Sequence, residues 1–111
     1  MPVVQVFAPE AGDVAALLAE LADGVAHALG LGGGDVIATF VPVSATVASG
    51  GGPGAGSDSW PIVAFHGSRR GGDLEAGAVA AAEAAVRSWA REAGIPTGGV
   101  WTEWVEPGLG A

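Results

Sequence analysis

Hydrophobic and polar positions follow two patterns along the first half of the chain. Residues 2–7 form a short apolar run, which is typical of a strand. From residue 13 to residue 29 the apolar side chains recur every three or four positions, which predicts a helix with one buried stripe. Asp13 suits the N-cap of this helix and Gly30 its C-terminal end.

A second strand is predicted by the apolar run at residues 36–41, and residues 42–47 extend it past a kink at Pro42. The second half then repeats the order. Residues 61–66 predict a strand, residues 73–93 a helix with Asp73 as its N-cap, and residues 100–105 a last strand.

The repetition indicates a duplicated β-α-β unit within one domain, residues 1–111. The pseudo-repeats are residues 2–47 and 60–106, joined by a connection rich in glycine and serine at residues 48–59. Pro2 and Pro61 lie 59 positions apart, near the starts of the two pseudo-repeats.

We therefore expect an α/β (α+β) fold, with four strands in one sheet and both helices on one face. Helices on one face cannot bury the other face. The apolar second face is most simply covered by further copies of the chain.

Composition narrows the classes of function. The net charge is −8 and the chain has no lysine, so neither nucleic acid nor an anionic membrane is an expected partner. Cysteine is absent, which excludes disulfides and thiolate catalysis. His27 and His66 have no third ligand at metal-binding spacing, so no metal site is expected. No cofactor is expected either. The chain has no transmembrane-length apolar run and no signal-peptide pattern, and we expect it to be cytoplasmic.

Pro2 is the residue with the most distinctive candidate chemistry. Removal of Met1 would leave a secondary amine at the start of a core strand. An ordinary α-amino group titrates near pH ~8, and burial favours its neutral form. Such an amine can act as a base or as a nucleophile at neutral pH. The alternative is an ordinary proline at the first position of a strand, where no ladder N–H is needed.

Cations are scarce enough to make any anion site local. Arg87 and Arg91 lie four residues apart on a predicted helix, as in a solvated face. Arg69 and Arg70 are the only arginines outside a predicted helix, and they follow the third strand. They are therefore the candidates for binding a carboxylate, with solvated loop charges as the alternative.

The chain resembles the tautomerase superfamily. The resemblance is carried by Pro2 with residues 3–6, by residues 36–42 with their late proline, by residues 65–67 and by residues 100–104. It is nearest to the macrophage migration inhibitory factor type, in which one chain holds two units that are each similar to a subunit of 4-oxalocrotonate tautomerase.

This resemblance implies the tautomerase fold, a homotrimer with an inner barrel of sheets, and a cofactor-independent isomerase. Pro2 would be the general base for keto-enol proton transfer on a small anionic 2-oxo acid or enol, in a pocket at each subunit interface. Trp101 would line the neighbouring subunit's pocket. Glu103, on the same strand face as Trp101, stands where the inhibitory factor has a polar amide-type residue. There it would repel an anionic substrate or serve as a second acid.

The chain also departs from the pattern. Leu31 and Ile37 stand where relatives carry a lysine and a substrate-binding arginine. Arg69 and Arg70 resemble arginines of the malonate semialdehyde decarboxylase branch. They would take the place of the missing lysine and arginine. Two alternatives stay open: a hydratase, dehalogenase or decarboxylase that depends on Pro2, and a non-catalytic trimeric binding protein.

Overall fold

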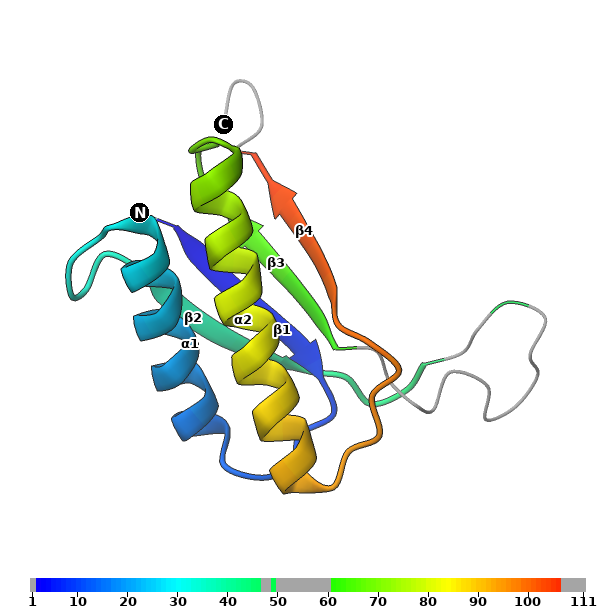
Figure 1. Ribbon diagram of the computed structural model, residues 1–111. Helices are drawn as coiled ribbons and strands as arrows, with labels where there is room; N and C mark the ends of the chain where they lie inside the picture. The colour runs from blue at the N-terminus through cyan, green and yellow to red at the C-terminus, as the bar shows by residue number, and fades with distance from the viewer. Residues whose placement is uncertain (1, 47–48, 50–60, 107–111) are drawn as a thin grey trace.

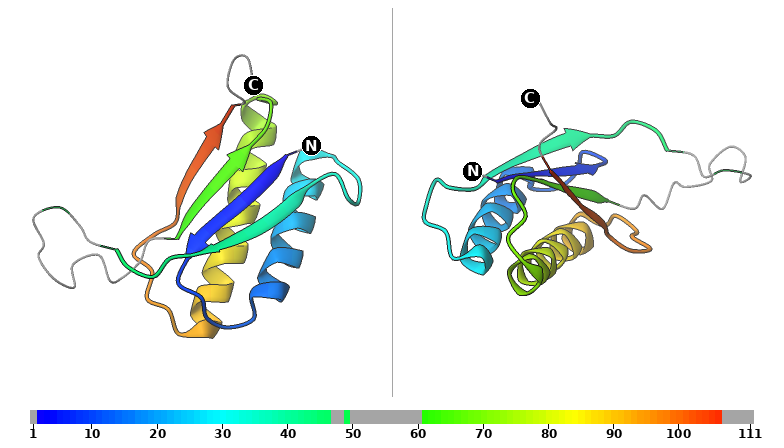
Figure 2. Two further views of the ribbon diagram at one scale, coloured as in Figure 1. Left: turned by 180° about the vertical axis from the view of Figure 1, so that it is seen from behind. Right: turned by 90° about the horizontal axis from the view of Figure 1, so that it is seen from above.

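The fold is known from a computed structural model, which describes residues 2–46, 49 and 61–106. Its elements are β1 (Val3–Ala8), α1 (Val14–Leu29), β2 (Ile37–Pro42), β3 (Ile62–His66), α2 (Gly72–Ala93) and β4 (Trp101–Val105). The strands form one sheet in the order β2-β1-β3-β4. Both helices cover the same face of this sheet (Figures 1 and 2). The predicted fold class is confirmed. The predicted connection, residues 48–59, lies outside the described residues except for Ser49.

The two β-α-β units are equivalent in their hydrogen bonding. β1 is parallel to β2 and β3 is parallel to β4, while β1 and β3 join the units in antiparallel fashion. The Ile37 N–H donates to the Pro2 carbonyl at 3.1 Å, and the Trp101 N–H donates to the Pro61 carbonyl at 2.9 Å. Each unit therefore begins with a proline that lacks a donor and uses its acceptor on the neighbouring strand.

Local signals set the helix boundaries. The Asp13 carboxylate accepts the Ala16 N–H at 2.9 Å, which is the predicted N-cap of α1. Gly30 and Gly94 end the two helices in the left-handed conformation, with φ of 70° and 73°. A side chain at either position would be strained, which is why glycine ends both helices. No helix within the described ranges is long and apolar enough to span a membrane.

Two expectations about element ends are wrong. Asp73 is not the N-cap of α2: the helix starts at Gly72 after Gly71, and the carboxylate of Glu75 accepts the N–H groups of Arg70 and Gly71 instead. The extension of the second strand past Pro42 is also absent over residues 43–46. Val43 donates a last bond to Ala8, where β1 ends, and residue 47 of the predicted extension lies outside the described residues.

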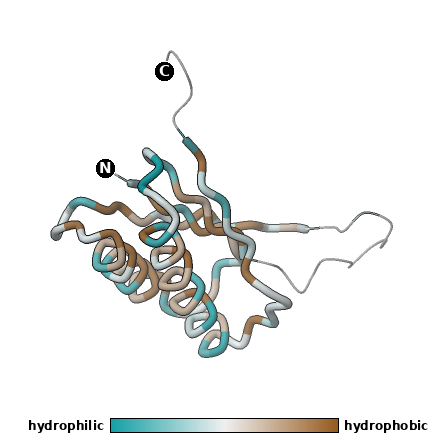
Figure 3. Tube along the Cα trace, turned by 45° about the horizontal axis from the view of Figure 1, so that its top comes forward, coloured by the Kyte–Doolittle hydropathy of each residue, from teal (hydrophilic) through white to brown (hydrophobic). Residues whose placement is uncertain are grey.

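The core lies between the sheet and the helices. Even-numbered residues of β1 point into it, and the α1 stripe of Leu17, Leu21, Val25 and Leu29 packs against them, as the spacing predicts. The helices approach closely where their residues are small: a Cβ on Gly24 would lie 3.6 Å from the Ala81 Cβ. Figure 3 shows hydrophobic positions recurring along the helices and along the extended segments beside them.

The opposite face of the sheet, which we call the open face, is apolar and is not covered by other elements of the single chain. Strand pairing aligns Val41, Phe7, Ile62 and Trp101 in one row across this face. Ile37, Ile62, Trp101 and Val105 are 43%, 39%, 57% and 37% exposed, and all four belong to this face. Hydrophobic side chains gathered on one face favour contact with another protein surface.

Asp13 caps α1 and Asp73 does not cap α2, so the two aspartates give a matched test of capping. Asp13→Ala removes a cap and is expected to lower the free energy of unfolding by about 1 kcal/mol. Asp73→Ala removes only a charge near the start of a helix, and its effect is expected to be about half as large or smaller. Urea unfolding of both variants measures the difference. Equal losses would mean that Asp73 contributes a cap after all.

Candidate active site

Pro2 is buried where the two units meet. It is less than 2% exposed and lies opposite Gly67, one residue beyond the last pair of the β1–β3 ladder. A Cβ on Gly67 would lie 3.4 Å from the Pro2 Cα, so the glycine allows the two backbones to approach. The start of β1, the ends of β3 and β4 and the start of α2 lie at the same end of the molecule (Figure 1). We call this the proline end.

Trp104 fixes the backbone beside Pro2. Its indole Nε1 donates to the Gly67 carbonyl at 3.1 Å, and its ring stacks on Phe65 with centroids 5.2 Å apart and planes 6° apart. The Gly67 N–H donates to the Val105 carbonyl at 3.2 Å. The wall of the proline end therefore comes from packed strands rather than from loops, which suits a site that needs fixed geometry.

Arg69 forms an ion pair within the β3–α2 loop. Its Nε lies 3.1 and 3.0 Å from the two oxygens of Glu75, and its Nη2 lies 2.6 Å from Glu75 Oε1. Its Nη1 also lies 3.9 Å from a carboxylate oxygen of Glu106. Several bonds from one guanidinium to one carboxylate hold both groups in a defined geometry. Arg69, predicted to bind substrate, already has an anionic partner in the chain.

Glu75 accepts hydrogen bonds from three successive residues. Besides Arg69, the N–H groups of Arg70 and Gly71 donate to its Oε2, at 2.7 and 3.3 Å. The hydrogen bond from Arg69, followed by that from the Arg70 backbone, lowers the pKa of Glu75 from 4.5 to about 2. The carboxylate is therefore ionised near neutral pH and holds the loop onto the first turn of α2.

Arg70 differs from its neighbour. Its Nε is buried and has no hydrogen-bond partner among the described residues. A guanidinium is always charged and carries five N–H donors, so a buried N–H without an acceptor is costly. Of the two predicted arginines, Arg70 is the one whose side chain still needs an anionic partner.

Trp101 and Glu103 are not close to Pro2 in the same chain. Both belong to the open face, as strand alternation predicts. Trp101 pairs with Ile62, which pairs with Phe7, five residues along β1 from Pro2. At the usual rise per strand residue this is a separation of about 17 Å. Pro2 and Trp101 can share a site only if they come from different copies.

Most polar side chains of the open face lie in its central row. Strand pairing aligns Thr39, Gln5, Ala64 and Glu103, and His66 Nε2 donates to Gln5 Oε1 at 2.9 Å. This bond links His66 to the neighbouring strand β1. No group of three or more residues in the described part of the chain is arranged to hold a metal ion.

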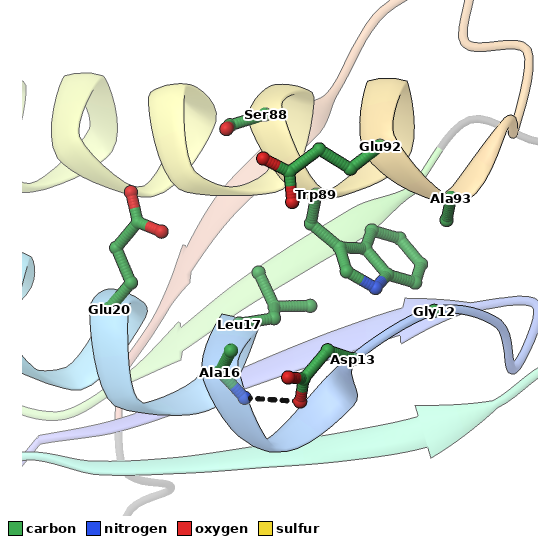
Figure 4. Close-up of a pocket in the computed structure, with 9 residues that line it drawn as sticks. All are labelled: Gly12, Asp13, Ala16, Leu17, Glu20, Ser88, Trp89, Glu92 and Ala93. Carbon is green, nitrogen blue, oxygen red and sulfur yellow. Dashed lines mark hydrogen bonds between the residues drawn. The ribbon is translucent and has the colours of Figure 1, made fainter.

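A pocket of about 320 Å³ lies at the opposite end of the molecule, between the start of α1 and the end of α2 (Figure 4). Carboxylates of Asp13, Glu20 and Glu92 line it, with Trp89 as one wall. The Trp89 Nε1 donates to the Ala11 carbonyl at 3.0 Å. The pocket contains none of the predicted site residues, and its negative charge disfavours an anionic substrate.

Glu75 and Trp104 contribute to the proline end in ways that the sequence analysis missed. Glu75 follows Arg69 by six residues, so helical i,i+4 spacing gives no signal for their pairing. The useful signal is a carboxylate in the first turn of a helix directly after a pair of arginines. Trp104 offered no signal beyond strand alternation, because its acceptor is a backbone carbonyl 37 residues away.

Comparisons with known proteins identify the fold. No family model and no curated protein matches the chain. A malonate semialdehyde decarboxylase structure is similar, with 17% identity, a TM-score of 0.66 and coverage of 98% of this chain and 91% of that chain. A macrophage migration inhibitory factor from Toxoplasma gondii has 22% identity, a TM-score of 0.63 and coverage of 95% and 89%. A fused 4-OT, an asymmetric trimer, has 16% identity, a TM-score of 0.70 and coverage of 97% and 92%.

The depressed pKa of Glu75 predicts how stability varies with pH. Because the pKa is about 2 in the folded chain and 4.5 ordinarily, the stabilisation by Glu75 is complete above pH 4.5 and is lost as the pH falls toward 2. The free energy of unfolding of wild type should therefore exceed that of Glu75→Gln at about pH 6, by an amount that shrinks at about pH 3.

Urea unfolding at both pH values measures this difference. Glu83→Gln is the matched control, since Glu83 lies on the same helix and makes no hydrogen bond or ion pair within the described residues. Its difference from wild type should stay small at both pH values. A Glu75→Gln difference that is independent of pH would contradict the assignment.

Proposed function

We propose that this chain, which has the fold of the tautomerase superfamily, is a cofactor-independent isomerase that catalyses keto-enol proton transfer on a small 2-oxo acid. The main support is the position of Pro2, which becomes a secondary amine once Met1 is removed. Pro2 is less than 2% exposed. It lies at the end of the sheet where the β3–α2 loop, with Arg69 and Arg70, begins. An amine in such surroundings loses hydration when protonated, which favours the free base at neutral pH.

In the proposed reaction the Pro2 nitrogen is the general base that transfers the proton. It takes a proton from the enol oxygen, or from the carbon next to the carbonyl, and returns it to the other atom. The substrate keeps its atoms and electrons, and the amine ends neutral. Arg70 binds the substrate carboxylate, because its guanidinium has a buried donor without an acceptor. Proton transfer by a well-placed side chain contributes about 10²- to 10⁴-fold to a rate.

The proposed pocket is completed by a second copy of the chain in a homotrimer. The exposed apolar face gives the driving force, and the similarity to a trimeric fused 4-OT supports this number of copies. Within one chain Trp101 and Glu103 lie about 17 Å and about 10 Å from Pro2 along the strands. In the trimer they therefore approach Pro2 from a neighbouring subunit. Trp101 excludes water there, and Glu103 faces the substrate as a negative charge or a second acid.

Each subunit has one such site. Pro61 is the counterpart of Pro2 in the second unit and is equally buried. Its nitrogen belongs to a peptide bond inside the chain, so it has no basic lone pair. The duplication therefore repeats the architecture without repeating the proposed chemistry.

A second candidate is decarboxylation or hydration that depends on Pro2. It is favoured by the arginine pair after β3 and by the exposed carboxylate of Glu103, which can orient water. The malonate semialdehyde decarboxylase that is similar to this chain was studied for decarboxylase and hydratase activities. Release of carbon dioxide from a 3-oxo acid, in place of ketonisation of a 2-oxo enol, would favour this candidate.

Replacement of Pro2 tests the amine directly. Pro2→Ala is expected to slow the conversion of phenylpyruvate enol to its keto form by about 100-fold or more, measured by ultraviolet absorbance. Pro61→Ala is the matched control, and its rate should stay within a few-fold of wild type. Intact mass must show that Met1 is absent from the active protein. An unchanged rate in Pro2→Ala, or activity with Met1 retained, would refute the proposal.

Assembly through the open face has its own matched pair. Ile62 and Leu74 are 39% and 43% exposed, but Ile62 lies on the open face and Leu74 on α2. Light scattering should give about 32 kDa for wild type, three times the 10.7 kDa chain. Ile62→Glu should reduce the mass toward one chain, because a charge at an apolar interface is strongly unfavourable. Leu74→Glu should leave the trimer intact, and a monomeric wild type would contradict the assembly.

A further inference from the structure

The two adjacent arginines of the β3–α2 loop have opposite environments. Arg69 is more than half exposed, yet three of its contacts to Glu75 are 3.1 Å or shorter. Arg70 is less exposed, and its buried Nε has no acceptor within the described residues. The more accessible cation is thus paired and the less accessible one is not. A pairing driven by exposure alone would give the reverse.

One carboxylate is within reach of both arginines. Glu75 Oε2 accepts the Arg70 backbone N–H at 2.7 Å, so the Arg70 side chain starts directly beside this carboxylate. Arg69 occupies both oxygens of this carboxylate, and the Arg70 guanidinium makes no bond to it. The charges of Arg69 and Glu75 cancel, and the charge of Arg70 stays uncompensated.

The two arginines of α2 lie too far away to take the place of Arg70 at the proline end. Arg87 lies 12 residues beyond Glu75 on α2, which is about 18 Å along a helix, and Arg91 lies further still. Glu106, the second carboxylate near Arg69, is 61% exposed at a distance of 3.9 Å, so solvent already satisfies most of its charge.

We infer that Arg69 is a positioning residue that sequesters Glu75 and thereby leaves Arg70 free to bind the carboxylate of an anionic substrate. The inference rests on the proposed function, since it assigns substrate binding to the proline end. It assigns different roles to two residues that the sequence makes equivalent. Without Arg69, Glu75 would pair with Arg70 and neutralise the site.

Binding of 3-phenylpropanoate, an unreactive carboxylate, tests the inference without turnover. Isothermal calorimetry gives Kd for wild type and for Arg70→Gln, Arg69→Gln, Arg69→Lys and the double variant Arg69→Gln/Glu75→Gln. Arg87→Gln is the control for loss of a distant arginine. Thermal unfolding of each variant is recorded in parallel.

We expect Arg70→Gln and Arg69→Gln to raise Kd by about tenfold or more, the size of one charge-assisted interaction. The double variant should restore Kd to within about threefold of wild type, because no carboxylate remains to capture Arg70. Arg69→Lys should also stay near wild type, since a lysine still neutralises Glu75. Arg87→Gln should have no effect. Recovery of binding in the double variant should occur without recovery of the unfolding temperature.

A merely structural role for the ion pair predicts the opposite order. The double variant lacks more contacts than Arg69→Gln and would then bind at least as poorly. That result, normal binding by Arg69→Gln, or absence of binding by wild type would overturn the inference. The outcome is independent of the Pro2→Ala assay. If turnover requires Pro2 but the double variant does not recover binding, only this inference is rejected. If the double variant recovers binding but turnover does not require Pro2, only the proposed chemistry is rejected.

Discussion

The antiparallel pairing of β1 with β3 is the interaction on which the rest of the structure depends. Each β-α-β unit supplies two parallel strands and one helix, and this ladder joins the units into one sheet. The same ladder brings Pro2 of the first unit against Gly67 of the second, which leads directly into the arginine loop. Because β1 and β3 run in opposite directions, the two helices also run in opposite directions, and α2 begins at the same end of the molecule as β1 (Figure 1). A single pairing thus fixes the core and the proline end.

Much of this architecture could be predicted from the sequence. Short apolar runs and an apolar spacing of three to four residues gave six elements in the right order, and Asp13 and Gly30 marked the ends of α1 because capping depends on neighbouring residues. Asp73 failed for a physical reason. A carboxylate further along the helix satisfies the N–H groups before it, and that arrangement depends on the conformation of a loop. The end of β2 failed because it depends on where its partner strand stops.

The candidate site was less predictable than the fold. Burial of Pro2 follows from its place at the start of a central strand, and strand alternation put Glu103 beside Trp101. The division of roles between Arg69 and Arg70 does not follow from any such rule. Two adjacent, identical side chains differ here in exposure and in which one reaches Glu75, and rotamers and loop path decide both. With four arginines and a net charge of −8, such a choice determines where any positive charge is available.

The sheet order has a consequence for how copies of the chain can add to one another. β2 and β4 are the outer strands, and within the described part of the chain each pairs on one side only. Unpaired strand edges recruit further strands, and combined with an apolar sheet face they favour open-ended fibres. A closed ring of copies satisfies such edges a limited number of times and then stops growing. Ring closure would therefore protect this chain from aggregation, and selection for solubility alone would preserve it in a descendant that kept no activity.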